Sequence, residues 1–303
     1  MKVLIATEKP FAKVAVDGIR EIVEAAGHEL ALLEKYTEKA QLLEAVADAD
    51  ALIVRSDKVT QEVVDAASQL KIVVRAGAGY DNVDLKACTE RNIVVMNTPG
   101  QNANAVAELA IGLMIFASRN GFTPGTGCEL SGKTLGIQGF GNIGQRIAKK
   151  AVALGMEVLV YTNEVKEKHQ RWNTIFSLEK LYSSCDFISV NIPATPLTKG
   201  CVNYNLLSHM PKGACLINTA RKEVVCEDGL AQVLEERPDL KYATDIAPAR
   251  HEEFKEKFGK RYFATPKKMG AETAEANINA GLAAAHEICD FFATGNTRFQ
   301  VNK

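Results

Sequence analysis

One stretch near the middle of the chain constrains the fold more than any other: Thr134-Leu-Gly-Ile-Gln-Gly-Phe-Gly-Asn-Ile-Gly144. It begins as a short apolar run that suits a buried parallel strand, and it ends with the spacing Gly-x-Gly-x-x-Gly. After Gly144, apolar residues recur at helical spacing until Gly155. A strand, a glycine turn and a helix in this order predict a dinucleotide site, because backbone N–H groups can then approach a pyrophosphate at the helix N-terminus.

Length and charge limit the class of protein. The 303 residues exceed one typical core, so we expect two lobes. With 36 basic and 37 acidic residues the formal charge is −1, which gives no electrostatic case for nucleic acid or a membrane surface as the main partner. The apolar N-terminal run is too short for a signal peptide, and the apolar stretch 105–118 is too short to cross a bilayer.

The cysteines indicate the redox compartment. There are seven, scattered without a C-x-x-C pair, in a long chain. This pattern is typical of a reduced cytoplasmic protein with buried thiols, and we expect no metal site.

Strand-like and helix-like segments alternate along most of the chain, which predicts an α/β fold with parallel sheets flanked by helices. The first lobe is expected to contain strands at 2–7, 51–56, 72–75 and 93–96, with helices at 11–26, 59–70 and 81–91. An apolar helix at 105–118 and a loop at 119–128 then lead to five strands, at 134–140, 157–161, 186–190, 214–218 and 242–245. A last helix is expected at 272–294.

Several separate stretches resemble a known family. They are Val54-Arg-Ser56, Val74-Arg-Ala-Gly-Ala-Gly-Tyr-Asp-Asn-Val-Asp-Leu85, Val95-Met-Asn-Thr-Pro99, Asn104-Ala-Val-Ala-Glu108, Gly132-Lys-Thr-Leu-Gly136 with the glycine motif, and Ile217-Asn-Thr-Ala-Arg221. Together they resemble the D-isomer-specific 2-hydroxyacid dehydrogenases, most of all the D-3-phosphoglycerate dehydrogenases.

The resemblance implies two Rossmann-like lobes, with the cofactor domain inserted into the substrate domain. Residues 1–98 and 277–303 would form the substrate-binding domain, and residues 99–276 the NAD-binding domain. The site would lie in the cleft, with hinges near 97–104 and 270–276. The family is typically dimeric through its cofactor domains, so a homodimer is expected. Serine-sensing domains of some relatives have no counterpart here, so we expect no feedback through such a domain.

Arginines at the ends of strands suit an anionic substrate. Arg221 follows the strand at 214–218, in the context of the family's catalytic arginine, and can bind a carboxylate through two hydrogen bonds and polarise the reacting oxygen. Arg55 and Arg75 follow or close strands of the first lobe, although each alone is equally consistent with an internal ion pair. The expected substrate-binding residues are Arg55, Ser56, Arg75, Ala76, Gly77, Ala78, Gly79 and Asn104.

The expected general base departs from the family. Relatives carry a histidine in a Thr-Pro-His context, followed by Gly-Ala, whereas this chain has Thr265-Pro-Lys-Lys-Met-Gly-Ala271 with one residue more. We predict Lys267 in this role; a lysine acts as a base at neutral pH only where burial or a neighbouring cation favours its uncharged form. Arg221 or Lys268 could supply the cation, and a surface lysine in a loop is the alternative.

The partner of that base departs as well. The position of the family's glutamate holds Arg250, followed by Glu252 and Glu253. His251 is a weaker candidate for the base, and the other histidines, His28, His169, His209 and His286, are expected at surface positions.

The expected cofactor is NAD. The residues assigned to it are Gly139, Gly141, Asn142, Ile143, Gly144, Thr162, Ile192, Pro193, Thr219, Ala220 and Asp245. Thr162 stands where NAD-binding domains usually carry an acid, which removes the repulsion against a 2′-phosphate and leaves NADP open. No arginine is there to bind that phosphate, although Lys166 and Lys168 are near, after Asn163 and Glu164.

The expected function is NAD-dependent oxidation of 3-phosphoglycerate to 3-phosphohydroxypyruvate in serine biosynthesis. A glycerate, hydroxypyruvate or other D-2-hydroxyacid dehydrogenase is the alternative within the class. A second alternative is a non-catalytic NAD(H)-sensing regulator that has lost the histidine and the glutamate, although Arg55, Arg75 and Arg221 argue against it.

Overall fold

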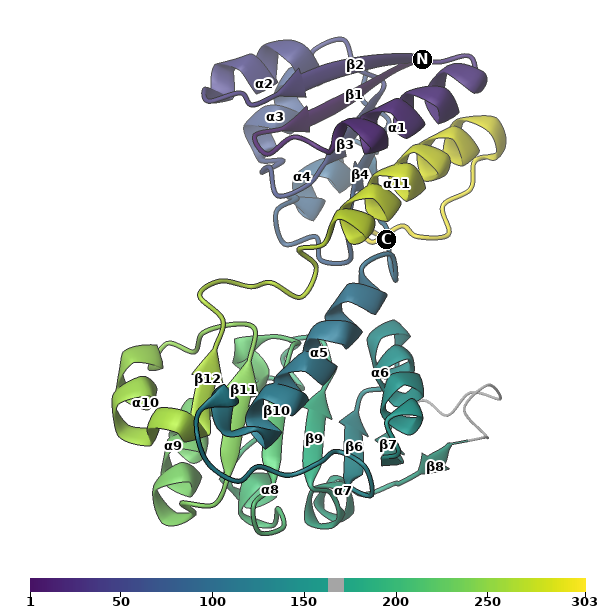
Figure 1. Ribbon diagram of the computed structural model, residues 1–303. Helices are drawn as coiled ribbons and strands as arrows, with labels where there is room; N and C mark the ends of the chain where they lie inside the picture. Colours follow the sequence, from purple (N-terminus) through teal and green to yellow (C-terminus); the bar gives the residue numbers. More distant parts are fainter. Residues whose placement is uncertain (163–171) are drawn as a thin grey trace. The chain divides into compact units, whose positions relative to one another are not determined.

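Two parallel sheets organise the chain, whose computed structural model describes residues 1–162 and 172–303 (Figure 1). The first unit comprises residues 1–102 and 272–303, and the second comprises residues 103–271. The boundaries between the units fall inside the two segments that were expected to act as hinges.

The first unit holds a five-stranded sheet in the order β2-β1-β3-β4-β5. Its strands are β1 (Lys2–Thr7), β2 (Glu29–Glu34), β3 (Ala51–Val54), β4 (Ile72–Arg75) and β5 (Val94–Asn97). All neighbours pair in parallel, for example Val3 opposite Leu30 and Ala51. Because helices cover both faces, the strands are almost continuously apolar.

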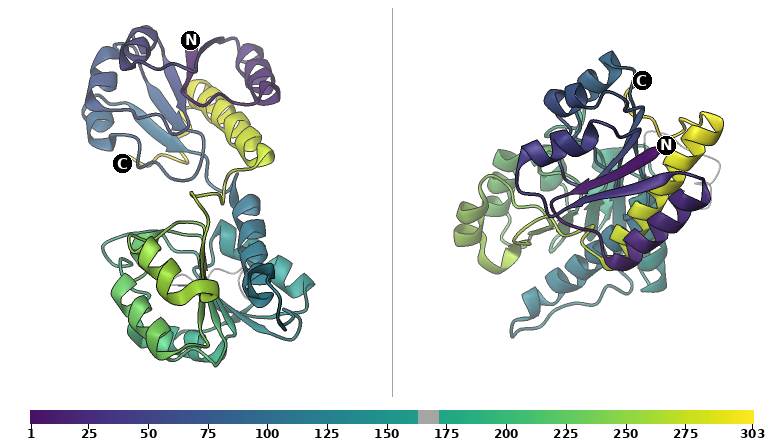
Figure 2. Two further views of the ribbon diagram at one scale, coloured as in Figure 1. Left: turned by 60° about the vertical axis from the view of Figure 1, so that its left-hand side comes forward. Right: turned by 90° about the horizontal axis from the view of Figure 1, so that it is seen from above.

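The helices of this unit divide between the two faces of the sheet. Helices α1 (Lys13–Ala25) and α11 (Ala274–Thr294) lie side by side on one face, although they come from opposite ends of the sequence (Figure 2). Helices α2 (Lys39–Val46), α3 (Gln61–Ala66) and α4 (Leu85–Glu90) share a core with the other face. The last residues return to the edge of the sheet, where Gln300 pairs with Met96.

The second unit holds a seven-stranded sheet in the order β12-β11-β10-β9-β6-β7-β8. Its strands are β6 (Thr134–Gln138), β7 (Glu157–Tyr161), β8 (Asn173–Thr174), β9 (Phe187–Val190), β10 (Cys215–Asn218), β11 (Lys241–Thr244) and β12 (Tyr262–Ala264). Strand order reverses at β6, between β9 and β7, which is where open parallel sheets bind ligands beyond the carboxyl ends of their strands.

Helices again cover both faces. Helices α5 (Ala103–Ser118) and α6 (Asn142–Ala153) share one core with the sheet, and α7 (Leu178–Ser184), α8 (Tyr204–Ser208), α9 (Glu227–Glu236) and α10 (His251–Phe258) share the other. No helix in the described part of the chain is both long and apolar enough to cross a membrane. All seven cysteines are free thiols.

In the described part of the chain, strands β2, β8 and β12 and helix α2 were not predicted. Strand β2 is an edge strand with two exposed positions, so its apolar pattern is incomplete. Strands β8 and β12 have two and three residues, which is too short for a pattern of alternation. The predicted cofactor sheet of five strands therefore has seven.

Candidate active site

The glycine loop joins β6 to α6 and requires glycine at two positions, Gly139 and Gly144. Gly139 has φ 94°, and a Cβ there would lie 2.6 Å from the carbonyl oxygen of Asn191. A Cβ at Gly144 would lie 2.4 Å from the carbonyl oxygen of Gly139, so this glycine lets α6 pack against the loop. Gly141, the N-cap of α6, has no atom within 4 Å of a Cβ position, which leaves room for a ligand above it.

Other predicted cofactor residues follow neighbouring strands of the same parallel sheet, so they share its carboxyl edge. Thr162 follows β7, Thr219 and Ala220 follow β10, and Asp245 follows β11. Ile192 and Pro193 come after β9; Ile192 is half-buried and Pro193 is exposed. In α6, Asn142 is exposed and Ile143 is half-buried. Lys166, Lys168, Asn163, Glu164 and His169 lie outside the described residues.

Buried polar atoms at this edge fit a polar ligand. Among the described residues, Asn191 Oδ1, Thr219 Oγ1 and Asp245 Oδ1 are buried without a hydrogen-bond partner. Buried polar atoms are normally satisfied, so three such atoms at the sheet edge that carries the glycine loop suit a group with many donors and acceptors. The residues present therefore fit a dinucleotide.

Asp245 is a fully buried carboxylate between two cationic residues. Burial raises its pKa, while the charges of Lys268 and Arg221 and the backbone N–H groups of Gly270 and Met269 act in the opposite direction. Gly270 N donates to Asp245 Oδ2 over 2.9 Å. This hydrogen bond brings the end of the Thr265–Gly270 turn to the end of β11.

Of the two adjacent lysines, Lys268 is the one directed toward the predicted catalytic residues. Its Nζ donates to the carbonyl oxygen of Ala220 over 3.0 Å. Lys267 is also exposed, and its carbonyl oxygen accepts a hydrogen bond of 2.6 Å from Thr265 Oγ1. Sequence reasoning counted forward from Thr265; counting back from Gly270 would have selected Lys268. The role of Lys267 stays a prediction.

Arg221 lies in a turn that Asn218 fixes. The fully buried Asn218 side chain accepts a hydrogen bond from Ala220 N over 3.0 Å and donates to the Arg221 carbonyl oxygen over 3.0 Å. The Arg221 guanidinium is half-buried and donates through Nη1 to the Ala220 carbonyl oxygen over 2.9 Å. Arg221 and Lys268 thus share the Ala220 carbonyl oxygen.

His251, the weaker candidate for the base, and Arg250, at the position of the base's partner, both have contacts within their own part of the second unit. Arg250 binds Glu253 at 2.5 Å and Asp228 at 2.9 Å. His251 Nδ1 lies 2.7 Å from the hydroxyl of Tyr262. Arg250 and Glu253 therefore form a structural ion-pair network, and His251 is held at the end of α10 by a tyrosine.

In the first unit, Arg55 follows β3 at the carboxyl edge of the sheet. Its Nη1 donates to the carbonyl oxygens of Lys9 (3.0 Å) and Pro10 (3.2 Å), and its Nη2 donates to Asn277 Oδ1 (2.7 Å). Its guanidinium also lies 5.1 Å from the centre of the Phe11 ring. These neighbours are uncharged, so they orient the guanidinium and leave its charge available for an anion. Sequence reasoning missed Asn277, which lies 222 residues away along the chain.

Arg75 ends β4 and packs against the following glycine turn. Its Nε donates to the Arg55 carbonyl oxygen over 2.9 Å. Gly77 has φ 149°, and a Cβ there would lie 1.7 Å from Arg75 Nη1. Only glycine therefore permits this position of Arg75. Ser56 is exposed, Ala76 and Gly77 are buried, and Ala78 and Gly79 are half-buried.

Asn104 belongs to the other unit, in the first turn of α5. Its Nδ2 donates to Glu108 Oε1 over 2.8 Å, and Lys150 binds the same oxygen at 3.2 Å. No group of His, Cys, Asp and Glu residues in the described part of the chain could hold a metal ion.

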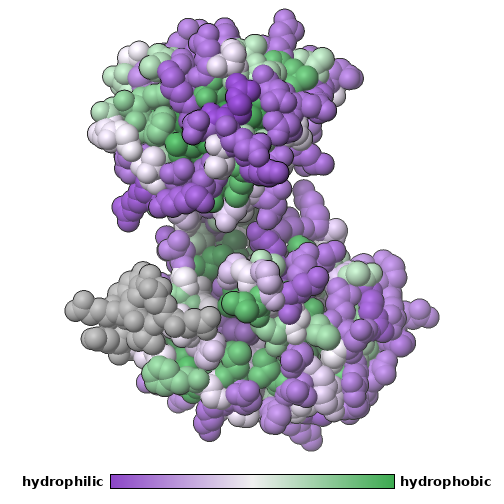
Figure 3. Space-filling model, turned by 180° about the vertical axis from the view of Figure 1, so that it is seen from behind, coloured by the Kyte–Doolittle hydropathy of each residue, from purple (hydrophilic) through white to green (hydrophobic). Residues whose placement is uncertain are grey.

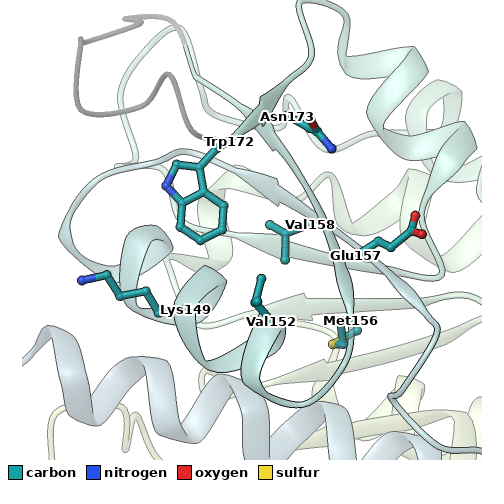
Figure 4. Close-up of a pocket in the computed structure, with 7 residues that line it drawn as sticks. All are labelled: Lys149, Val152, Met156, Glu157, Val158, Trp172 and Asn173. Atoms are coloured by element: carbon teal, nitrogen blue, oxygen red, sulfur yellow. The ribbon is translucent and has the colours of Figure 1, made fainter.

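A hollow in the second unit lies away from all of these residues (Figure 4). It measures about 710 Å³ and is lined by Lys149, Val152, Met156, Glu157, Val158, Trp172 and Asn173. Lys149 and Val152 belong to the last turns of α6, and Glu157 and Val158 begin β7. The hollow is therefore at the amino edge of the sheet, opposite the glycine loop.

Comparison with known proteins agrees with this geometry. Residues 117–266 match the NAD-binding domain of the D-isomer specific 2-hydroxyacid dehydrogenases. A hydroxypyruvate reductase of Thermotoga maritima is 35% identical, covering 86% of this chain and 90% of its own. A D-3-phosphoglycerate dehydrogenase of Methanocaldococcus jannaschii is 36% identical over 82% of this chain, which spans 51% of that protein.

Among solved structures, NAD+-bound 3-phosphoglycerate dehydrogenase of Entamoeba histolytica is 52% identical, with a TM-score of 0.89. The alignment covers 100% of this chain and 99% of that one. The chain belongs to the D-isomer specific 2-hydroxyacid dehydrogenase family, whose members are NAD-dependent oxidoreductases. It spans about half the length of the curated phosphoglycerate dehydrogenases that it matches.

Proposed function

We propose that this chain is a D-3-phosphoglycerate dehydrogenase, which oxidises 3-phosphoglycerate to 3-phosphohydroxypyruvate with NAD in serine biosynthesis. The observation that carries the proposal is Arg55, whose guanidinium donates to uncharged oxygens of Lys9, Pro10 and Asn277 at the carboxyl edge of the first sheet. A substrate with a phosphate as well as a carboxylate has an anion for Arg55 in addition to the one for Arg221. The similarity to the Entamoeba histolytica enzyme over the full chain supports the same substrate.

We assign substrate binding to the first unit and NAD binding to the second. The Gly139–Gly144 loop and the N-terminus of α6 would hold the pyrophosphate. Asp245 Oδ1 would accept a hydrogen bond from the rest of the cofactor, and Thr219 Oγ1 would donate or accept one. When bound, NAD supplies the hydride acceptor. NAD is preferred to NADP; a higher kcat/KM with NADP at equal concentration would contradict this preference.

The chain's own residues supply the remaining chemistry. Arg221 would hold the substrate carboxylate and polarise the reacting oxygen. A lysine of the Lys267–Lys268 pair would move the proton: as an amine it takes the proton of the hydroxyl, and as an ammonium it returns one to the carbonyl oxygen. We favour Lys268 over Lys267, because Lys268 Nζ and the Arg221 guanidinium share the carbonyl oxygen of Ala220.

Two matched variants test this assignment. Lys268→Met is expected to lower kcat by about 100-fold or more, with a smaller change in the affinity for NADH. Lys267→Met makes the same change of shape and charge at the adjacent residue, and we expect it to lower kcat less than Lys268→Met does. A larger loss from Lys267→Met would return the role to Lys267, and unchanged kcat in both variants would remove lysine from the mechanism.

The phosphate assignment is tested by Arg55→Met. The variant should raise KM for 3-phosphohydroxypyruvate by about 10-fold or more and should change KM for hydroxypyruvate less, since only the first substrate has a phosphate. Arg221→Met is the contrasting variant, because it should impair both substrates. Equal effects of Arg55→Met on the two substrates would argue against a phosphate at Arg55.

The similarity to the Thermotoga maritima hydroxypyruvate reductase favours a second candidate, a hydroxypyruvate or glycerate dehydrogenase. It would keep Arg221 and the lysine in the same roles and leave Arg55 without a phosphate. The Arg55→Met comparison separates the two candidates.

We also propose a cytoplasmic homodimer. Apolar side chains of the second unit are exposed, notably Ile115 (37%), Val152 (52%) and Leu154 (41%), and apolar patches interrupt the polar surface in Figure 3. Ile115 and Leu154 line one hollow and Val152 lines the hollow of Figure 4, so a second copy could cover both. Sedimentation equilibrium should give twice the chain mass; a monomer at micromolar concentration would contradict this.

A further inference from the structure

Asp57 is a buried carboxylate at the point where strand order reverses in the first sheet. Its exposed fraction is 4%, and it lies just after β3, which neighbours β1. Oδ1 accepts hydrogen bonds from Glu8 N over 2.7 Å and from the Tyr36 hydroxyl over 3.0 Å. Oδ2 accepts one from Arg55 N over 3.3 Å. One carboxylate thus joins the segments that follow β1, β2 and β3.

Tyr36, two residues after the end of β2, hydrogen-bonds to this carboxylate. Its side chain is 7% exposed, and its hydroxyl donates to Asp57 deep within the unit. Asn82 Nδ2 donates to the carbonyl oxygens of Asp57 over 2.6 Å and Arg55 over 3.3 Å. The backbone around Arg55 is therefore fixed on both its N–H and its carbonyl side.

The segment after β1 is held at two points. Asp57 holds its beginning through Glu8 N, and Arg55 Nη1 binds the carbonyl oxygens of the next two residues, Lys9 and Pro10. The position of those carbonyl oxygens decides where the guanidinium points. Asp57 therefore acts on the Arg55 side chain through the turn that the side chain contacts.

The geometry also keeps the two charges apart. Asp57 binds the backbone N–H of Arg55, and no ion pair between their side chains occurs among the described residues. A carboxylate paired directly with the guanidinium would compete with an incoming anion. Because Asp57 binds the backbone of Arg55 instead, it fixes this segment without neutralising the Arg55 guanidinium.

We propose that Asp57 and Tyr36 are positioning residues for the phosphate of the substrate: they fix the Glu8–Pro10 turn, which in turn aims the Arg55 guanidinium. This inference rests on the proposed function, because it requires Arg55 to bind phosphate. Neither residue touches the substrate.

The test is steady-state reduction of 3-phosphohydroxypyruvate and of hydroxypyruvate by the full chain carrying Tyr36→Phe, with Asp57→Asn as a second variant. Tyr36→Phe removes only one hydroxyl and should raise KM for the phosphorylated substrate by about 3- to 10-fold, because small errors of position cost binding steeply. We expect kcat, KM for hydroxypyruvate and the Kd for NADH to stay within about twofold, since these do not depend on Arg55. Asp57→Asn should likewise raise only KM for the phosphorylated substrate, and by more than Tyr36→Phe does.

Asp50→Asn is the matched control. Asp50 Oδ2 accepts a backbone hydrogen bond from Lys2 N over 2.9 Å in the same sheet, but at its amino edge. This variant should lower the melting temperature without changing the ratio of the two KM values.

Two results would overturn the proposal. If Tyr36→Phe and Asp57→Asn lower the melting temperature while the ratio of KM values stays that of the wild type, the two residues are structural only. If the wild type itself does not prefer the phosphorylated substrate, the proposed function fails and the role of Asp57 and Tyr36 in phosphate binding fails with it. The behaviour of the wild type therefore distinguishes the two failures.

Discussion

Replacing Glu287 with glutamine should stabilise the protein at alkaline pH. Glu287 lies in α11, and its Oε2 is buried without a hydrogen-bond partner in the described structure. Burial, and secondarily the charge of Asp290, raises the pKa of Glu287 from 4.5 to about 8. The folded state therefore binds the proton more tightly than the unfolded chain does.

The sign and size of the effect follow from proton linkage. Below pH 4.5 the carboxyl is protonated in both states, so it carries no charge penalty; the penalty grows as the pH rises and is complete above about pH 8. The difference between the two pKa values corresponds to a loss of at most about 5 kcal/mol in the free energy of unfolding. Because the Glu287 side chain keeps some contact with solvent, we expect the actual loss in the free energy of unfolding to be about 2 kcal/mol.

Urea unfolding at pH 5 and pH 9 measures this difference. Glu287→Gln should have nearly the wild-type free energy of unfolding at pH 5 and about 2 kcal/mol more at pH 9. Glu275→Gln, an exposed change in the first turn of the same helix, is the control and should show no such dependence. A constant difference between Glu287→Gln and wild type at both pH values would refute the reasoning.

Further predictions concern the glycine loop and the C-terminus. Gly144→Ala should weaken NADH binding by about 10-fold or more, measured by fluorescence titration, because its Cβ would lie 2.4 Å from the Gly139 carbonyl oxygen; unchanged affinity would contradict the geometry. Asn302→Ala should lower the free energy of unfolding by about 2 kcal/mol, since the buried Asn302 side chain binds Val95 N and the Ile93 carbonyl oxygen over 2.8 Å each. A loss below about 0.5 kcal/mol in urea unfolding would show that water replaces these bonds.

Much of the fold could be predicted because local signals were strong. Strands β1 and β7 have the predicted bounds, since each is an apolar run with a clear end. The α/β class, the parallel sheets and the glycine loop were also confirmed. Strands β8 and β12 were missed because their order comes from pairing with β7 and β11, which a two- or three-residue segment does not encode.

The site could be predicted only where its residues follow strands. Arg55, Arg75 and Arg221 could be placed at the carboxyl edges of their own sheets because each follows or ends a parallel strand, while their roles stay predictions. Asn277, which orients Arg55, carries no local signal, since its contact depends on how α11 packs on the first sheet. The motif alone leaves Lys267 and Lys268 as alternatives, since counting from Thr265 and from Gly270 gives different residues, and the contact of Lys268 with Ala220 is the structural reason to favour Lys268.

The most direct test of the proposed function is the ratio of kcat/KM for 3-phosphohydroxypyruvate to that for hydroxypyruvate, followed through NADH absorbance with the wild-type protein. A phosphate bound by Arg55 should make this ratio about 10 or more. A ratio near or below 1 would contradict the account and move the chain to the hydroxypyruvate or glycerate dehydrogenases.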